Sequence, residues 1–351
     1  MEYVTGGQKG ETVEIGQILK ENMYGSLIKV HGIVHSIRDM SEFAFIVLRK
    51  RDGIIQCVIT KEQFEAQRNL LHEGTSMVAE GVARQEDRAP NGFELVVQDM
   101  QFLSQPAEQM PLPVGKWKMK TSLETKLAMR PVALRNLRER AIFKLQEGII
   151  RGFREYLYSQ GFTEIHTPKI VAGNAEGGAN VFKLEYFGKK AFLAQSPQFY
   201  KQMLVPVYER VFETAPVFRA EKHNTTRHLN EYTSLDFEMG FIDSFEDIMA
   251  METGMLKYVM KLLQEQYAKE LSILKLTLPD VSRIPKIKFA DAKNLIAQTY
   301  GHVIRNPFDL EPEEEQLIGK YFKEEEGSDF VFVTHYPSKK RPFYAMDDPE
   351  D

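Results

Sequence analysis

The residues best suited to chemistry gather in one segment, APVFRAEKHNTTRHLNEYTSLDFEMGFI, from Ala215 to Ile242. Its two apolar, strand-like flanks enclose the charged or ionisable residues Arg219, Glu221, His223, Arg227, His228, Glu231, Asp236 and Glu238. Such a set fits a functional site for charged groups. It equally fits a solvated, charged hairpin tip, and the segment alone leaves both interpretations open.

Several common catalytic motifs are absent from the sequence. It contains no Walker loop, dinucleotide glycine fingerprint, HExxH or GxSxG motif. The single cysteine, Cys57, forms neither an intramolecular disulfide nor a thiolate metal cluster, so a reducing, cytoplasmic setting is expected. The sequence has no basic-then-apolar signal at its start, and no apolar run approaches the roughly 20 residues of a membrane helix. We expect neither export nor membrane insertion.

Residues 26 to 104 have the pattern of a small β-barrel. Five short runs rich in Val, Ile and Phe are separated by turn signals such as Asp52-Gly53. A helical stretch over 61–74 lies between the third and fourth runs, and we expect Gly74 to end it. This is the order of an OB barrel, a fold that commonly binds single-stranded nucleic acid. Because the net charge is −5, any contact with nucleic acid must be local.

A proline-containing stretch, SQPAEQMPLPVG, ends the barrel pattern. We therefore expect a first domain over 1–105, a linker over 106–135 and a second domain over 136–351. The second domain begins with a long helix that Gly161 ends, and its apolar face contains Leu137, Ala141, Leu145, Ile149, Phe153 and Leu157. Strand-like runs at 191–196, 210–221 and 232–242 precede a helix from about 245 to 269. This segregation predicts an α+β domain on an antiparallel sheet flanked by helices.

Several motifs carry a family resemblance. FRAEKHNTTRHLNE resembles the second signature motif of class II aminoacyl-tRNA synthetases, and GFTEIHTPKI resembles the first. NAEGGANVF resembles the mobile loop that closes over the amino acid, and QSPQFYKQML the amino-acid-binding strand of the aspartyl enzymes. THYPSKKRPFYAM matches the same subfamily. Over essentially its whole length the chain is similar to aspartyl-tRNA synthetases, which place an OB anticodon-binding barrel before the catalytic domain.

The resemblance implies an ATP-dependent activation of L-aspartate and its transfer to the 3′ end of tRNA(Asp). Arg219 would grip the α-phosphate of ATP, a role that suits its fixed fork of donors. Glu221 would bind the adenine amino edge, Tyr232 would lie against the adenine face, and Arg227 with His228 would reach the outer phosphates. Arg219 and Glu221 are the expected catalytic pair. Mg²⁺ is implied by the resemblance alone, and the sequence identifies no metal ligand.

The resemblance also implies an aspartate site. Lys201 matches the lysine that binds the side-chain carboxylate, and Asp236 matches the acid that holds this lysine. Ser196 and Gln198 are expected on the same strand, and Glu176 in the mobile loop would bind the substrate ammonium. Asparaginyl relatives usually lack the lysine and carry Glu at the position of Asp236, so both residues favour aspartate.

In the barrel, Phe45 matches an aromatic that stacks on an anticodon base, and Arg38 and Gln56 match polar residues beside it. Phe45 can equally be a residue of the barrel core. The barrel resembles that of archaeal-type aspartyl enzymes, some of which also charge tRNA(Asn). His35 and Pro90 occupy positions where relaxed and strict members differ, and they favour the relaxed type.

The resemblance departs at the end of the sequence. A third class II motif should follow residue 346 and is absent, so we expect a fragment of a longer enzyme, and the activity of this chain alone stays open. Pro168 matches the motif 1 proline at the interface of an obligate homodimer. Two alternatives stay open: an asparaginyl-tRNA synthetase, and a non-catalytic tRNA-binding protein derived from a synthetase.

Overall fold

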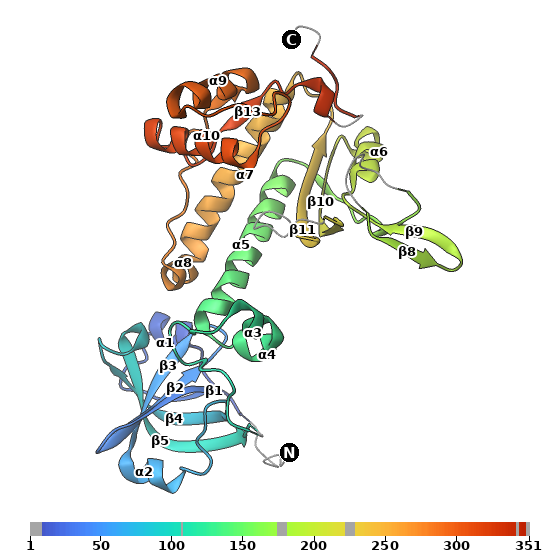
Figure 1. The fold of residues 1–351 in the computed structure, drawn as a ribbon. Coiled ribbons are helices and arrows are strands. Elements are labelled where there is room, and N and C mark those ends of the chain that lie inside the picture. Colours follow the sequence, from blue (N-terminus) through green and yellow to red (C-terminus); the bar gives the residue numbers. More distant parts are fainter. Residues whose placement is uncertain (1–8, 107, 174–180, 222–228, 342–343, 349–351) are drawn as a thin grey trace. The chain divides into compact units, whose positions relative to one another are not determined.

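The protein is described from a computed structural model, which covers residues 9–106, 108–173, 181–221, 229–341 and 344–348 (Figure 1). The chain divides into two compact units, Met1–Arg140 and Ala141–Asp351. The predicted linker lies inside the first unit, and the domain boundaries drawn from the sequence stay predictions. Among the described residues, no helix combines the length and hydropathy of a membrane span.

A closed five-stranded barrel forms most of the first unit. Its strands are β1 (Leu27–Asp39), β2 (Phe43–Arg49), β3 (Ile54–Thr60), β4 (Ser76–Gln85) and β5 (Phe93–Ser104). Their order is β1-β2-β3-β5-β4, and β4 pairs with β1 to close the barrel. Alternate side chains, such as Ala44, Ile46 and Leu48 of β2, are fully buried in the core. The predicted five-stranded barrel is confirmed.

The predicted helix over 61–74 is wrong in length. Helix α2 (Lys61–Ala66) has only six residues, although it begins as expected, with Thr60 accepting a hydrogen bond from the N–H of Gln63. Residues 67 to 74 form turns that bury Leu71 in the barrel core. Gly74 has a φ of +96° within these turns, and its N–H donates to the carbonyl of Val34 in β1. Burial against the barrel therefore outweighs continuation of the helix. The unit also contains α1 (Ile15–Lys20) and η1 (Pro90–Gly92).

The segment after the barrel has a small core of its own. It contains α3 (Leu123–Ala128) and α4 (Arg130–Ala133), and the core residues are Leu112, Val114, Met119 and Ala133. The buried Asn136 donates from its amide to the carbonyls of Val114 (2.9 Å) and Lys116 (2.7 Å). Its Oδ1 accepts from the N–H groups of Arg138 and Glu139, at the start of α5 (Leu137–Ser159). One side chain thus joins the linker to the beginning of the long helix.

Two three-stranded sheets lie in the second unit. One has the order β11 (Glu231–Met239), β10 (Arg210–Phe218), β6 (Thr163–Glu164). The other has the order β7 (Ile170–Val171), β9 (Lys189–Leu193), β8 (Lys183–Tyr186). The β6 strand runs parallel to β10, whereas β10 pairs antiparallel with β11. The α+β class is confirmed, and the sheet is mixed where a purely antiparallel one was expected.

Helices α5 and α7 (Phe245–Gln266) pack on one face of the β10–β11 pair. The contacts join Phe153 of α5 to Phe212 of β10 at 5.7 Å between ring centroids. Gly148 of α5 allows the two helices to approach, because a Cβ there would lie 2.6 Å from Leu263 of α7. The predicted apolar face is wrong at Ile149, which is 40% exposed. A four-residue repeat drifts around a helix of 3.6 residues per turn, so not every member of it reaches the core.

The remaining elements are α6 (Gln198–Tyr208), α8 (Ala268–Leu274), β12 (Lys286–Lys288), α9 (Phe289–Tyr300), α10 (Pro312–Glu325), β13 (Phe332–Thr334) and η2 (Ser338–Lys340). The predicted helix over 245–269 ends earlier, at Gln266. Between α9 and α10 lies a buried ion pair, with 2.5 Å between Lys293 Nζ and Glu314 Oε2. Lys293 also donates to the main-chain oxygens of Asn306 and Asp309, so its ammonium is fully hydrogen-bonded.

Candidate functional site

Alternation along β10 and β11 sorts their side chains onto two faces. Phe212 and Phe237 point toward α5 and α7. The opposite face therefore takes the intervening residues, which in β11 are Tyr232, Ser234, Asp236 and Glu238, and in β10 include Glu213. Arg219 continues this face just past β10, where its N–H donates to the carbonyl of Asn230. We call this set the ribbon face.

The ribbon face contains a nearly buried ion pair. Lys201 of α6 is 8% exposed, and its Nζ lies 2.8 Å from Asp236 Oδ1 and 3.9 Å from Glu238 Oε2. The hydroxyl of Ser234 donates to the other oxygen of Asp236. The acid is thus fixed from two sides, and it orients an ammonium that has further donors to offer. The predicted partnership of Lys201 with Asp236 is present in the structure.

One detail of the sequence prediction is wrong. Ser196, Gln198 and Lys201 do not share a strand, because Gln198 and Lys201 belong to α6 and Ser196 precedes it. The helix begins where the N–H of Lys201 donates to the carbonyl of Pro197, at 2.9 Å. Residues 198 and 201 are three apart on this helix and so lie on neighbouring positions of its surface. Ser196 Oγ accepts a hydrogen bond from the N–H of Gln198, at 3.3 Å.

Glu238 has a perturbed environment beside this pair. Burial is the main cause that raises its pKa, Asp236 adds to the rise, and Lys201 opposes it. A further anion arriving at Lys201 would disfavour the charged form of Glu238 still more.

A pocket of about 390 Å³ lies next to the start of α6. Its lining comes from Val171 to Gly173, from Leu193 to Ser196, and from Phe199, Tyr200 and Met203 of the helix. Ser196 is the one predicted site residue in this lining. The pocket is mostly apolar, so it can hold the uncharged part of a ligand beside the charged ribbon face.

Two of the predicted ATP residues, Arg219 and Tyr232, occupy the far end of the ribbon face. The guanidinium carbon of Arg219 lies 5.9 Å from the centre of the Tyr232 ring. The amide nitrogen of Asn230 donates to the carbonyls of Arg219 (3.0 Å) and Glu221 (3.2 Å). This contact fixes the main chain at both residues. Three other predicted residues, Glu176, Arg227 and His228, lie outside the described part of the chain.

Glu213 is a further residue of the ribbon face, which the sequence reading missed. It lies opposite Asp236 in the register of β10 and β11, and it is 2% exposed. It accepts from Thr167 N (2.6 Å), Thr167 Oγ1 (2.8 Å) and Lys169 Nζ (2.8 Å). These bonds hold the residues on both sides of Pro168, which is itself exposed. The available signal was a lone acid inside an otherwise apolar strand, VFETAPVF.

Polar residues cross the outside of the barrel. Arg38 of β1 donates to Gln56 of β3 (2.6 Å), and Gln56 donates to Glu94 of β5 (2.8 Å). Arg84 of β4 pairs with the same glutamate. The guanidinium of Arg38 also lies 4.7 Å from the centre of the Phe45 ring. We call these five residues the barrel face. Phe45 belongs to it and is partly exposed, so it is not a residue of the barrel core.

His35 and Pro90 are not part of the barrel face. His35 is 4% exposed and lies 3.5 Å from a guanidinium nitrogen of Arg49. Burial, and then the charges of Arg49 and Arg140, lower its pKa from 6.5 to about 4. Pro90 begins η1, whose Asn91 amide donates to the carbonyl of Ile54 at the start of β3.

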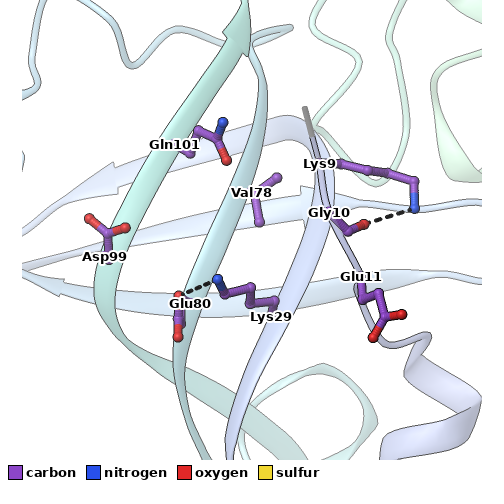
Figure 2. Close-up of a pocket in the computed structure, with 8 residues that line it drawn as sticks. All are labelled: Lys9, Gly10, Glu11, Lys29, Val78, Glu80, Asp99 and Gln101. Carbon is purple, nitrogen blue, oxygen red and sulfur yellow. Dashed lines mark hydrogen bonds and ion pairs between the residues drawn. The ribbon is translucent and has the colours of Figure 1, made fainter. Parts of the chain in front are cut away.

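A second hollow, of about 300 Å³, lies on the barrel and contains none of the predicted residues (Figure 2). Lys29 points to Glu80 there, with 2.9 Å between Nζ and Oε2, and Asp99 lies on the neighbouring strand. Lys29 and Glu80 are thus paired within the hollow, and Lys9 donates to the carbonyl of Gly10. The described residues also contain no group of three or more His, Cys, Asp or Glu side chains arranged to hold a metal ion.

Comparison with known proteins bears on both units. Residues 122–351 match the family model of class II tRNA synthetases (D, K and N), and residues 28–103 match that of OB-fold nucleic acid binding domains. An aspartate–tRNA(Asp/Asn) ligase of Deinococcus radiodurans is 46% identical over 92% of this chain and 72% of its own length. An aspartate–tRNA(Asp) ligase of Pyrococcus horikoshii is 40% identical over 93% of this chain and 76% of its own.

A solved structure gives the same picture of the fold. The asparaginyl-tRNA synthetase of Pyrococcus horikoshii, crystallised with asparaginyl-adenylate, superposes with a TM-score of 0.85. The superposition covers 97% of this chain and 78% of the asparaginyl enzyme's chain, at 30% sequence identity. Identity to the aspartate ligases is therefore higher than identity to this asparaginyl relative.

Proposed function

The chain belongs to the class II tRNA synthetases, in the branch of the aspartate–tRNA ligases, and we propose that it joins L-aspartate to the 3′ end of tRNA(Asp). The observation that carries the choice of amino acid is Lys201, nearly buried and oriented by Asp236 on the ribbon face. A buried ammonium with donors to spare suits a side-chain carboxylate, and it offers nothing to a carboxamide nitrogen.

The reaction has two steps. An oxygen of the aspartate α-carboxylate attacks the α-phosphorus of ATP, and pyrophosphate leaves with the electrons of the broken P–O bond. A hydroxyl of the terminal tRNA ribose then attacks the carbonyl carbon of the adenylate, and AMP leaves. Both steps depend on positioning and on neutralising negative charge. ATP would enter as its magnesium complex, since Mg²⁺ is bound largely through the substrate phosphates.

The ribbon face supports this reaction through its spacing. Tyr232 and Asp236 are four residues apart on one strand, which is roughly 13 Å at 3.3 Å per residue. Arg219 and Tyr232 would hold the α-phosphate and the adenine at one end, together with Glu221, Arg227 and His228. Lys201 would bind the aspartate side chain at the other, with Ser196, Gln198 and Glu176 around the substrate. An extended aspartyl-adenylate fits along such a face.

Selection against asparagine would follow from hydrogen-bond pairing. Aspartate and asparagine have almost the same shape, so only a polar contact separates them. A site built for one pairing rejects the analogue that cannot make it by orders of magnitude. Asp236 holds the ammonium in place for this pairing.

The barrel face would bind the anticodon. Phe45 offers a ring on which a base can stack, worth about 1–3 kcal/mol, and Arg38 with Gln56 offers donors beside it. We further propose the relaxed specificity that includes tRNA(Asn), which His35 and Pro90 favour. A homodimer with Pro168 at its interface and a cytoplasmic location complete the proposal.

Aspartate-dependent exchange of pyrophosphate into ATP tests the proposed function. Any exchange that the chain catalyses should depend on aspartate and not on asparagine, and Lys201→Ala should lower it about a thousandfold or more. Lys201→Arg keeps a cation beside Asp236 and separates loss of charge from misfolding. Lys257→Ala, at an exposed lysine of α7, is the matched control and should behave as the wild type.

Two results would contradict the proposal. Exchange with asparagine exceeding that with aspartate would favour the asparaginyl activity. Exchange unaffected by Lys201→Ala would remove the aspartate site from this lysine. A folded chain without any exchange would leave the family assignment intact, because the activity of this chain alone is open. Charging of tRNA(Asp) and tRNA(Asn) in parallel then tests the relaxed specificity.

A further inference from the structure

We propose that Lys169 and Glu213 form a positioning pair for the aspartate site. In this role Lys169 keeps the carboxylate of Glu213 away from Lys201, so that the ammonium of Lys201 stays available to the substrate. We call Lys169 and Glu213 the second ion pair. The inference rests on the proposed function, which places the aspartate side chain at Lys201.

Two carboxylates lie side by side on the ribbon face. Glu213 of β10 and Asp236 of β11 are directly opposite each other in the register of the strands. The Cβ atoms of such a pair are about 4.5–5.5 Å apart, and like charges in this position repel each other. Glu213 is 2% exposed, so salt and water screen this repulsion little. The arrangement therefore requires a cation for each acid.

Each of the two acids has a lysine of its own. Lys169, just before β7, has its Nζ 2.8 Å from Glu213 Oε2. Lys201, in α6, has its Nζ 2.8 Å from Asp236 Oδ1. Thr167 adds two hydrogen bonds to Glu213, from its N–H at 2.6 Å and from its hydroxyl at 2.8 Å. The carboxylate of Glu213 is thus held by the segment before β7, and that of Asp236 by α6.

Loss of Lys169 would make Glu213 a competitor for Lys201. Helix α6, which carries Lys201, contacts both β10 and β11. A glutamate is one methylene longer than an aspartate, and this one starts about 5 Å from Asp236, so a change of rotamer can bring its carboxylate to the same ammonium. An ammonium has only three donors. A bond to Glu213, added to the bond to Asp236, would take a donor that the substrate needs.

The balance of charge would change in the same direction. Lys169 and Lys201 lie among three acids, Glu213, Asp236 and Glu238. Without Lys169, one cation would remain among these acids, and an incoming aspartate side chain would meet more repulsion.

The nucleotide end of the ribbon face lies farther from the second ion pair. Tyr232 is roughly 13 Å along β11 from Asp236, at about 3.3 Å per residue. This separation exceeds the Debye length of about 8–10 Å at ordinary salt. Loss of Lys169 should therefore weaken the binding of the aspartyl group and leave that of ATP nearly unchanged. A purely structural role of the second ion pair would affect both ligands.

Binding of an adenylate analogue tests the proposal without requiring catalysis. We would measure by calorimetry the dissociation constants of the 351-residue chain for ATP and for the sulfamoyl analogue of aspartyl-adenylate. Lys169→Met should weaken binding of the analogue by about 10–100-fold, the effect of losing one hydrogen bond to a charged group. The same variant should change the affinity for ATP by less than about threefold, because the nucleotide end is screened from the lost charge.

Two further variants separate competition from loss of structure. Lys169→Arg keeps a cation beside Glu213 and should restore most of the affinity for the analogue. The double variant Lys169→Met with Glu213→Gln lacks both charges of the second ion pair and removes the competing carboxylate, so it should also recover most of the affinity. If Lys169→Met does not fold, these two variants decide the question.

A matched control comes from another partly buried lysine. Lys126 pairs with Glu139 and is 22% exposed at its side chain, against 21% for Lys169. Lys126→Met removes the same charge at the same exposure, far along the chain from the ribbon face. It should bind ATP and the analogue as the wild type does. Urea unfolding of every variant shows which of them fold.

Each outcome decides between the two proposals. Equal weakening of both ligands by Lys169→Met, or a double variant that binds the analogue no better than the single one, overturns the inference. Loss of analogue binding in Lys201→Ala, with Lys169→Met unchanged, overturns the inference and leaves the proposed aspartate site intact. Analogue binding unaffected by Lys201→Ala overturns both. A folded chain that binds no analogue overturns the inference and leaves the family assignment intact.

Discussion

His35 makes the stability of the barrel depend on pH. The side chain is buried, and burial together with Arg49 and Arg140 lowers its pKa from 6.5 to about 4. In the unfolded chain the imidazole regains its ordinary pKa. Between these two values the unfolded chain binds a proton that the folded chain does not. The stability due to neutral His35 is therefore complete above about pH 6.5 and is lost as the pH falls toward 4.

The two pKa values give the size of the effect. At about pH 5 the unfolded imidazole is mostly protonated and the folded one is mostly neutral, so the free energy of unfolding falls by about 2 kcal/mol relative to about pH 8. The full separation of the two values sets an upper limit of about 3 kcal/mol.

Urea unfolding between about pH 8 and about pH 5 measures this loss. Wild type and His35→Gln share all carboxylates, so the difference between their pH profiles isolates the imidazole. The variant should lose about 2 kcal/mol less than the wild type over this range. His166→Gln, which removes an exposed histidine, should follow the wild type. Parallel profiles for wild type and His35→Gln would refute the reasoning.

Three further sets of substitutions test the packing within the two units. Gly148→Ala places a methyl 2.6 Å from Leu263 of α7 and should destabilise the second unit by about 1–3 kcal/mol. Gly319→Ala, with open space around it in α10, should stabilise the unit by up to about 1 kcal/mol. Equal thermal midpoints for the two variants would contradict this. Asn136→Asp keeps the oxygen that accepts at the start of α5 but loses both amide donors to Val114 and Lys116, and should cost about 1–3 kcal/mol in urea unfolding. An unchanged urea midpoint would show that these two hydrogen bonds do not stabilise the chain. Lys293→Met leaves Glu314 buried without its cation and should lower the free energy of unfolding by about 3–5 kcal/mol. Adding Glu314→Leu should recover most of this loss. A double variant as unstable as the single one would show that the unpaired carboxylate is not the cause.

The sequence predicted the barrel well because its signals are local. Period-two alternation and turn residues mark each strand, and both survive in the folded chain. The helix over 61–74 was overestimated since Leu71 is buried by the barrel, a contact that no local pattern records. Ile149 was assigned to the core by a four-residue repeat, which cannot follow a 3.6-residue helix for long.

The site depended on resemblance more than on pattern. Lys201 and Asp236 are 35 positions apart, and only the family motif paired them before the structure did. The same motif suggested a strand where α6 forms. Glu213 went unnoticed, although an acid in the middle of an apolar strand must find partners. An acidic residue inside an apolar strand thus predicts hydrogen-bond partners on a neighbouring segment.

The ribbon face also limits how such a protein can be re-engineered. Its residues share one side only because β10 and β11 keep a fixed register from Arg210↔Met239 to Phe218↔Glu231. A one-residue insertion or deletion inside either strand would turn the later ribbon-face side chains to the α5–α7 side and the later core side chains to the ribbon face. The proposed recognition of both the nucleotide and the amino acid would then be lost in a single event. New specificities are therefore reachable by point substitution along these strands, and changes of length belong in the connections outside them.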